Sequence, residues 1–84
     1  MYRVEPDATV AEQIDALPYE ALLGYAEALG VMELAPWSGR SLNEVNPDAE
    51  VRQLVFGLGG DGLVTYLVLE RDRWVDVLDV QWVG

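Results

Sequence analysis

The stretch VRQLVFGLGGDGLVTYLVLE, residues 51–70, decides the fold class of this chain. Residues 51–56 and 63–70 are rich in β-branched and other apolar side chains, which favour strands. The glycine-rich segment 57–62 separates them, so the stretch predicts a β-hairpin. Residues 63–70 are apolar on both faces, which is typical of a central strand.

A third strand is predicted at residues 74–83, WVDVLDVQWV, after a tight turn at residues 71–72. The apolar side chains change face along this run, which indicates a bulge near Val77 or burial on both sides. Asp76 and Asp79 are three positions apart, so strict alternation places them on opposite faces.

Before residue 36 the apolar pattern is helical, apart from a short strand at residues 1–5. A helix is predicted from residue 8 to residue 17, with Asp7 as its N-cap, and a second from residue 18 to about residue 34. The expected buried positions are Val10, Ile14 and Leu17 in the first helix, and Leu22, Tyr25 or Ala26, Leu29 and Met32 in the second.

The predicted order is strand, helix, helix, strand, strand, strand, within one domain of residues 1–84. Helices and strands that do not alternate favour the α+β class, with a helical hairpin on one face of a mainly antiparallel sheet. The first strand then joins the sheet only after the helices fold back. Residues 35–50 are irregular, with an extended piece at 39–42 and a turn at 46–48.

Composition excludes several kinds of chemistry. The chain of 84 residues has no cysteine and no histidine, five arginines, no lysine and fifteen acids, for a net charge of -10. Disulfides, thiolate or imidazole zinc sites, and nucleophile–histidine pairs are therefore absent. The charge opposes nucleic acid binding. Because no apolar run is long enough for a membrane and no signal peptide is recognisable, we expect a soluble cytoplasmic protein.

Two motifs have simpler interpretations than their letters suggest. Residues 57–62 spell G-x-G-x-x-G, but a dinucleotide site needs a helix next, and a strand pattern follows. We therefore interpret them as a hairpin loop and expect no cofactor. The many acids are interpreted as a solvated surface, with no metal site.

The irregular segment contains the residues that suit a binding surface. Trp37 beside Arg40 has the composition of an interface hot spot, although packing of Trp37 over an open end of the core also explains it. Arg40 and Arg52 flank the segment and could bind phosphate. An ion pair with one of three nearby acids is the alternative: Glu44, Asp48 or Glu50.

A series of patterns runs in chain order: YRVEP at 2–6, the break at Leu17-Pro18, GRSL at 39–42, VRQL at 51–54, the glycine loop, LVTYLVLE at 63–70 and WVDVLDVQWV at 74–83. Over essentially the whole chain this series resembles the RelE/ParE superfamily of type II toxin–antitoxin toxins. The resemblance implies a RelE-like fold, a curved antiparallel sheet with the helical hairpin on one face. Arginine without lysine fits a divergent member from a GC-rich, actinobacterial source.

The resemblance also implies a site to look for. In the ribosome-dependent ribonucleases of the family, a basic cluster on the concave sheet face stabilises the transition-state phosphate, and a C-terminal tyrosine often assists. Arg52 matches one basic residue of about four. Leu54, Leu63 and Val83 stand where other basic residues are common, and the chain stops at Gly84 without a tyrosine tail. The resemblance therefore implies little or no cleavage.

Three functional hypotheses remain. The first is a toxin homologue that acts by binding a protein, as the gyrase-directed branch does, or that is degenerate. The second is a working mRNA endoribonuclease with a non-standard set, for which Arg40, Arg52 and Tyr66 are the candidates. The third is a non-toxin protein-binding module on the same fold. The missing basic set favours the non-enzymatic hypotheses.

The family implies an antitoxin as partner. Antitoxins are typically acidic, whereas an acidic chain repels them, so we expect a neutral or basic partner. Trp37 and Arg40, together with the edge of the sheet, are the expected contacts. A homodimer formed through the same edge is the alternative.

Overall fold

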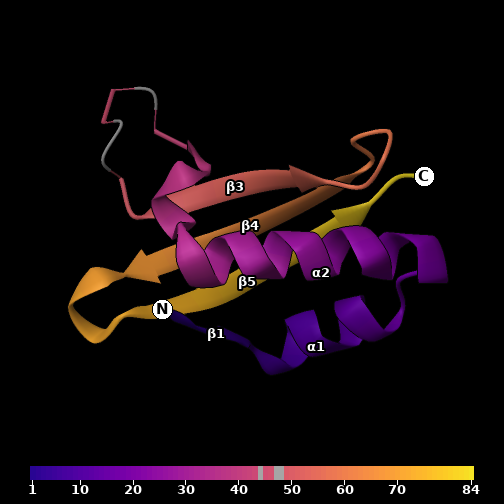
Figure 1. Cartoon of the computed structure of the whole chain (residues 1–84), viewed down its shortest axis with the longest axis horizontal. Helices are drawn as coiled ribbons and strands as arrows, with labels where there is room; N and C mark the ends of the chain where they lie inside the picture. Colours follow the sequence, from indigo (N-terminus) through magenta and orange to yellow (C-terminus); the bar gives the residue numbers. More distant parts are fainter. Residues whose placement is uncertain (44, 47–48) are drawn as a thin grey trace.

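The computed structural model describes residues 1–43, 45–46 and 49–84. Over these residues, five strands form one sheet in the order β1-β5-β4-β3-β2, and two α-helices cover one of its faces (Figure 1). The elements are β1 (Arg3–Pro6), α1 (Ala8–Asp15), α2 (Tyr19–Leu34), the 3-10 turn η1 (Pro36–Ser38), β2 (Arg40–Ser41), β3 (Val51–Phe56), β4 (Gly62–Leu69), the 3-10 turn η2 (Glu70–Asp72) and β5 (Trp74–Trp82). The predicted α+β class and element order are confirmed.

The helical hairpin forms where prolines and a capping aspartate set the helix ends. The Val10 amide donates to Asp7 Oδ1 at 2.8 Å, which satisfies one of the free amides at the start of α1. Pro18 precedes α2, and its fixed φ of -67° suits entry into the helix while ending α1. The two helices run in opposite directions over the same sheet face (Figure 1).

The predicted buried face of α2 is confirmed at Tyr25 and Met32 and wrong at Leu22. Leu22 is 38% exposed and Leu29 is only half-buried. The buried residues are Ala21, Gly24, Tyr25, Ala28 and Met32. Small residues face the sheet because α2 approaches β3 closely, and a Cβ on Gly24 would lie 2.7 Å from the amide nitrogen of Gly57. Since α2 also carries apolar residues on the side away from the sheet, its periodicity indicated the packed side only in part.

The hairpin of β3 and β4 is confirmed. Gly57 and Gly60 in its loop have φ values of 92° and 72°, in the left-handed region that glycine adopts without strain. A strand follows these glycines, so the dinucleotide-binding interpretation is excluded. The second of the two strands, β4, lies between β3 and β5, as predicted for the central strand.

The predicted bulge near Val77 is present in β5. Thr65 pairs with Asp79 and Tyr66 pairs with Val77, so Leu78 is an extra residue opposite the Thr65/Tyr66 step. The extra residue lets the apolar side chains of β5 stay on the buried face although their spacing in the sequence changes.

The bulge also corrects our placement of two acids. Asp76 pairs with Leu67 and Asp79 pairs with Thr65, and these partners lie two positions apart on one side of β4. Asp76 and Asp79 are therefore on the same side of the ladder, not on opposite faces. Gln13 of α1 donates a hydrogen bond to Asp79 at 3.0 Å.

The first strand joins the sheet in the predicted way. After the helices fold back, β1 pairs with β5 in parallel, with Val4 beside Val75. The Tyr2 amide also donates to the Glu33 carbonyl at 2.8 Å, which ties the N-terminal strand to the end of α2. The connection between these two parallel strands is long, because the helical hairpin and strands β2, β3 and β4 lie between them in the sequence.

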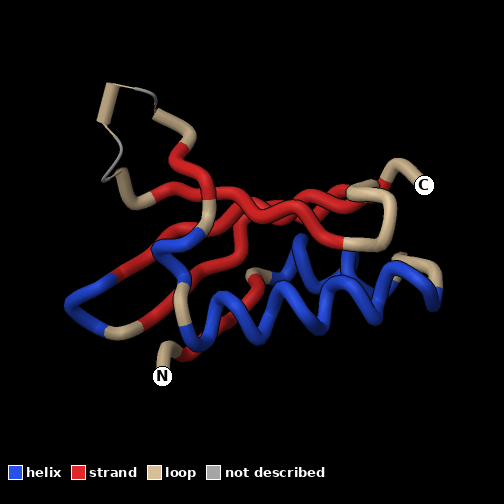
Figure 2. Tube along the Cα trace, turned by 45° about the horizontal axis from the view of Figure 1, so that its top comes forward, coloured by secondary structure: helices blue, strands red, loops and turns tan. Residues whose placement is uncertain are grey.

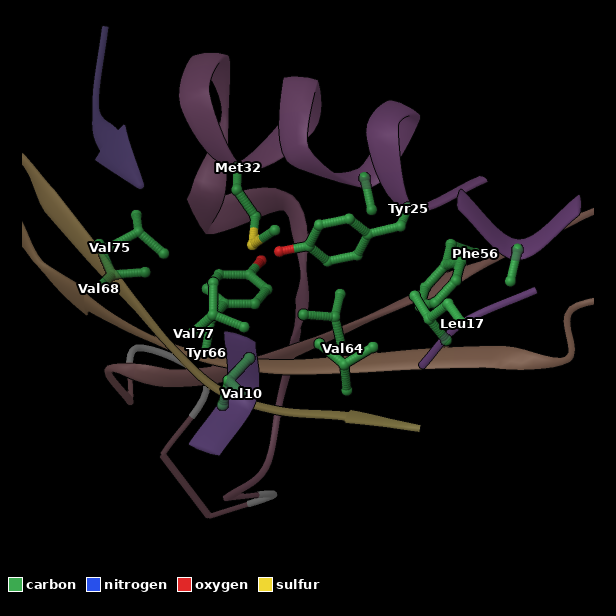
Figure 3. Close-up of a cluster of buried hydrophobic side chains, with 13 residues drawn as sticks. Val10, Leu17, Tyr25, Met32, Phe56, Val64, Tyr66, Val68, Val75 and Val77 are labelled. Atoms are coloured by element: carbon green, nitrogen blue, oxygen red, sulfur yellow. The ribbon is translucent and has the colours of Figure 1, made fainter. Parts of the chain in front are cut away.

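The two helices lie against one face of the sheet (Figure 2), and the core side chains fill the space between the two layers (Figure 3). The aromatic part of the core is a row in which Tyr25 meets Phe56 edge-on at 5.9 Å and Phe56 stacks on Trp82 at 6.0 Å between ring centroids. The stripe predicted for the first helix is confirmed, because Val10 and Leu17 are buried and Ile14 packs against the core.

The segment predicted as irregular contains η1 and β2, so the extended piece at residues 39–42 is confirmed. The turn predicted at residues 46–48 includes Pro47 and Asp48, which lie outside the described residues. In the described part of the chain, no helix is long and apolar enough to cross a membrane.

Candidate functional site

The sheet has one face under the helices and one open face. On β4, Val64, Tyr66 and Val68 are fully buried beneath the helices. Since side chains alternate along a strand, Thr65 and Leu67 between them point to the other side, where both are half-buried. We call this other side the open face. It is also where the cross-strand neighbours of these two residues lie.

Tyr66, the candidate tyrosine, lies under η1 on the covered face. Its ring is fully buried and its hydroxyl donates to the Pro36 carbonyl at 2.5 Å. Burial raises its pKa to about 12, against smaller lowering effects from Arg52 and the Gly39 backbone. The hydroxyl is therefore protonated at neutral pH and engaged inside the protein, where substrate has no access.

Arg52, the candidate cation, lies beside Tyr66 in the β3–β4 ladder and is only 7% exposed. Its Nη1 donates to the carbonyls of Gly39 at 2.8 Å and Trp37 at 3.2 Å. The guanidinium also lies 4.8 Å from the centroid of the Trp37 ring, a cation–π contact. Through these contacts Arg52 connects η1 and the residue before β2 to strand β3 of the sheet.

Arg40, the third candidate, is exposed on β2 and pairs with Gln53. Gln53 donates to Thr65 at 3.1 Å, so this row of side chains belongs to the open face. The structure therefore brings Arg52 and Tyr66 together but separates them from Arg40 by the thickness of the sheet. Of the acids that we expected to pair with Arg40 or Arg52, Glu44 and Asp48 lie outside the described residues.

Trp37 packs over the end of the core, which confirms the packing interpretation of this residue. Its indole Nε1 donates to Glu70 at 2.6 Å. The same carboxylate accepts from the Tyr2 hydroxyl at 2.6 Å and pairs with Arg73 at 3.0 Å. The pKa of Glu70 is lowered, first by the hydrogen bond from Tyr2 and then by that from Trp37.

No pattern in the sequence indicates that these four residues form one cluster, which we call the Glu70 cluster. Its members are the residue before β1, one residue each from η1 and η2, and the residue that follows η2, and the most distant pair, Tyr2 and Arg73, is 71 positions apart. The Arg73 guanidinium also lies 4.7 Å from the Tyr2 ring centroid. No local pattern signals such a meeting, because it depends on the parallel pairing of β1 with β5. The role of Glu70 here is to join the N-terminal strand to the sheet end.

The positions that the family resemblance implied do not form one surface. Arg52 and Leu54 project from β3 toward the covered side, where Leu54 pairs with Val64. Leu63 pairs with Val55 and Gln81 on the open face. A basic residue at Leu54 and one at Leu63 would therefore point in opposite directions.

The open face offers little for phosphate chemistry. Of the cations on it, Arg3 is paired with Glu5 at 3.5 Å, while Arg40 is exposed at the β2 edge. Asp76 adds a carboxylate near the centre of the sheet and accepts from the Trp74 indole at 2.7 Å. Among the described residues, no group of three or more carboxylates is placed to hold a metal ion.

No protein-family model and no curated protein sequence matches the chain. The matches are to solved structures. The isolated E. coli RelE toxin in its P21 crystal form superposes with a TM-score of 0.81 at 12% identity, over 100% of this chain and 86% of the toxin. The intact E. coli RelBE toxin–antitoxin complex gives 0.79 at 13% identity, over 100% and 99%. The archaeal RelE-RelB complex from Pyrococcus horikoshii gives 0.65 at 23% identity, over 99% and 96%.

Proposed function

Because the chain has the RelE-like fold, we propose that it is a divergent RelE/ParE-like toxin homologue of a type II toxin–antitoxin system, acting through protein binding or degenerate. The observation that supports this proposal is the placement of Arg52 and Tyr66. Both are buried and hydrogen-bonded under η1, so the polar groups that resemble a ribonuclease set serve the fold instead. The proposed place of action is the cytoplasm of an actinobacterial cell.

Loss of ribonuclease activity follows from the charges that a cleavage site needs. Loss of one contact to the developing charge of a transition state lowers the rate by about 10²–10³-fold. A site with one cation in place of several would therefore cleave RNA very slowly. Arg40 is the exposed cation of the three candidates, and it faces away from Tyr66.

The test is expression of the chain alone in a bacterial host, with messenger RNA ends mapped in translating extracts. We expect no codon-positioned cleavage. Arg40→Ala is the informative variant, because its side chain is exposed and the fold does not depend on it. Arg52→Ala is a second variant, checked by circular dichroism for folding. Cuts that disappear in either folded variant would contradict the proposal and favour the working endoribonuclease.

The proposed partner is an antitoxin, since two of the matching structures are complexes of RelE with RelB. The net charge of -10 makes an acidic antitoxin a poor match, so we propose a neutral or basic one. Trp37 and Arg40 are the proposed contacts: Trp37 is half-buried in η1, and Arg40 is exposed at the β2 edge.

Co-purification from the native host, followed by binding at several salt concentrations, tests the partner proposal. A partner encoded next to this chain supports the toxin homologue, whereas an unrelated partner favours a non-toxin binding module. A strongly acidic partner that binds more tightly at low salt would show that the charge argument is wrong. A homodimer through the sheet edge would appear as a doubled mass for the chain alone.

A further inference from the structure

The outer side of α2 is apolar along its whole length. The residues opposite its buried face are spaced four, three, four and four positions apart, so they form one line along the helix. They are Tyr19, Leu23, Ala26, Gly30 and Leu34, which we call the outer stripe. Tyr19 is 77% exposed, Leu23 57% and Leu34 73%. Figure 1 shows α2 lying across the sheet with this far side uncovered.

A surface helix normally carries polar residues on the side away from the core. Single exposed apolar residues need no explanation, but a continuous line of them marks an interaction surface. The outer stripe spans the 16 residues of α2, a length of about 24 Å. A helix of similar length is the element that such a line fits, because side chains of two helices interdigitate along their axes.

Two small residues at the centre of the stripe leave room for a partner backbone. Ala26 and Gly30 lie between the larger Leu23 and Leu34, so the middle of the stripe is lower than its ends. A Cβ built on Gly30 meets no atom within 4 Å. The surface is therefore open at this point, where a helix could approach closely.

The charges beside the stripe identify the chemistry of the partner. Glu20 and Glu27 lie on one flank and Glu33 on the other, by helical spacing. Between residues 4 and 39 the sequence contains seven acids and no arginine, lysine or histidine. All five cations lie elsewhere in the chain, so every charged side chain of α2 beside the outer stripe is a carboxylate.

We propose that the outer stripe of α2 binds a basic amphipathic helix of a protein partner, whose apolar side chains cover the stripe and whose lysines or arginines meet the flanking glutamates. A second copy of this chain would place glutamates against glutamates. An anionic membrane or a nucleic acid would meet the same repulsion. This inference goes beyond the proposed function and does not depend on it, since it would hold for any role of the RelE-like fold.

The experiment uses the intact chain and three synthetic peptides of about 15 residues. The first has leucines at helical spacing flanked by lysines, the second has glutamates in place of the lysines, and the third has the first peptide's composition with the leucines scrambled. Fluorescence anisotropy gives the affinities, and amide NMR shifts locate the contact. We expect the first peptide to bind at least about tenfold more tightly than the others, with shifts on α2.

Variants of the chain separate this surface from general acidity. Leu23→Ser with Leu34→Ser should weaken binding by about tenfold or more, whereas Leu42→Ser with Val83→Ser, exposed to a similar extent away from α2, should leave it unchanged.

The flanking charges have their own matched pair of variants. Glu20→Gln with Glu27→Gln should weaken binding and reduce its salt dependence, and Asp72→Asn with Glu50→Gln is the control for net charge. Both controls keep the outer stripe and its flanks intact, so only a contact on α2 distinguishes them from the test variants.

Other occupants are measured in the same series. Equal binding of the lysine and glutamate peptides, or shifts confined to the open face, would overturn the proposal. So would a dimer of the chain alone that Leu23→Ser abolishes, seen by sedimentation, or binding to phosphatidylglycerol vesicles that the same variant weakens. A monomer that ignores the vesicles and binds the lysine peptide on α2 supports it.

Discussion

At the scale of single residues, Gly39 lies at a position where packing leaves no room for a side chain. It follows η1, and its carbonyl accepts the hydrogen bond from Arg52. Its backbone is in an ordinary extended conformation, with φ of -67°, so glycine is not needed for the turn itself. Glycine is needed for space, because a Cβ here would run into the Tyr66 hydroxyl and lie 2.9 Å from the carbonyl oxygen of Gln53.

We expect Gly39→Ala to destabilise the protein by about 1–3 kcal/mol, the usual cost of overpacking a tight site. Gly30→Ala is the matched control, since the same added methyl group meets open space on α2 and removes a flexible residue from a helix. It should stabilise the protein by about 0.5–1 kcal/mol. Urea unfolding followed by tryptophan fluorescence measures both. Equal effects of the two variants would show that contact at Gly39 is not limiting.

At the scale of elements, the bulge in β5 keeps apolar residues on one face of the sheet although their spacing in the sequence changes from two to three positions. Val75 and Val77 face the helices, and so does Val80, three positions further on. In a regular strand, three positions would turn Val80 to the open face. Leu78 absorbs the difference as an unpaired residue, and the pairs on either side of it remain regular.

Deletion of Leu78 should therefore keep every pair of the β4–β5 ladder and reduce stability by about 1 kcal/mol or less. Deletion of Gln81, in the regular part of the same strand, should cost at least about 2 kcal/mol more. It moves Trp82 to the open face and away from Phe56, on which it stacks. Urea midpoints of the two deletion variants test this order, and a larger loss for the Leu78 deletion would contradict it.

At the scale of the whole molecule, the Glu70 cluster joins segments from both ends of the chain. Tyr2 precedes β1, Trp37 lies in η1, and Arg73 follows η2 in a left-handed conformation with φ of 52°. All three contact one exposed carboxylate. The ionised Glu70 carboxylate therefore connects segments from both ends of the chain at one end of the sheet. Protonation of Glu70 at low pH weakens these contacts.

The pKa of Glu70 is lowered from its usual value of 4.5 in the folded protein, first by its hydrogen bond from Tyr2. A group with a depressed folded pKa contributes stability above its unfolded pKa and loses it as the pH falls through the folded pKa. We expect the difference in unfolding free energy between the wild type and Glu70→Gln to be constant above pH 4.5 and to shrink below it.

Low pH also protonates the other carboxylates and weakens their mutual repulsion. Because the wild type and Glu70→Gln share this effect, the difference between them reports on the Glu70 carboxyl alone. Glu27→Gln on the exposed side of α2 serves as the control for the removal of one negative charge. Urea unfolding between pH 7 and pH 3 measures all three proteins. A wild-type advantage that stays constant to pH 3 would exclude the proposed role of Glu70.

Local physics was enough to determine the elements from the sequence. Proline and Asp7 set the helix ends, glycine set the hairpin loop, and β-branched runs set the strands, because each of these effects acts within a few residues. The family resemblance indicated the RelE-like fold for the same reason, since it rested on the order and spacing of these elements.

Only the tertiary structure decided which faces meet. The buried side of α2 depends on how closely it approaches β3 at Gly24, because α2 also carries apolar residues on its outer side. The candidate set of Arg40, Arg52 and Tyr66 is divided because alternation across the sheet sends Arg40 to the open face and the other two under η1. Such placements are set by contacts between residues far apart in the chain, and no local pattern contains them.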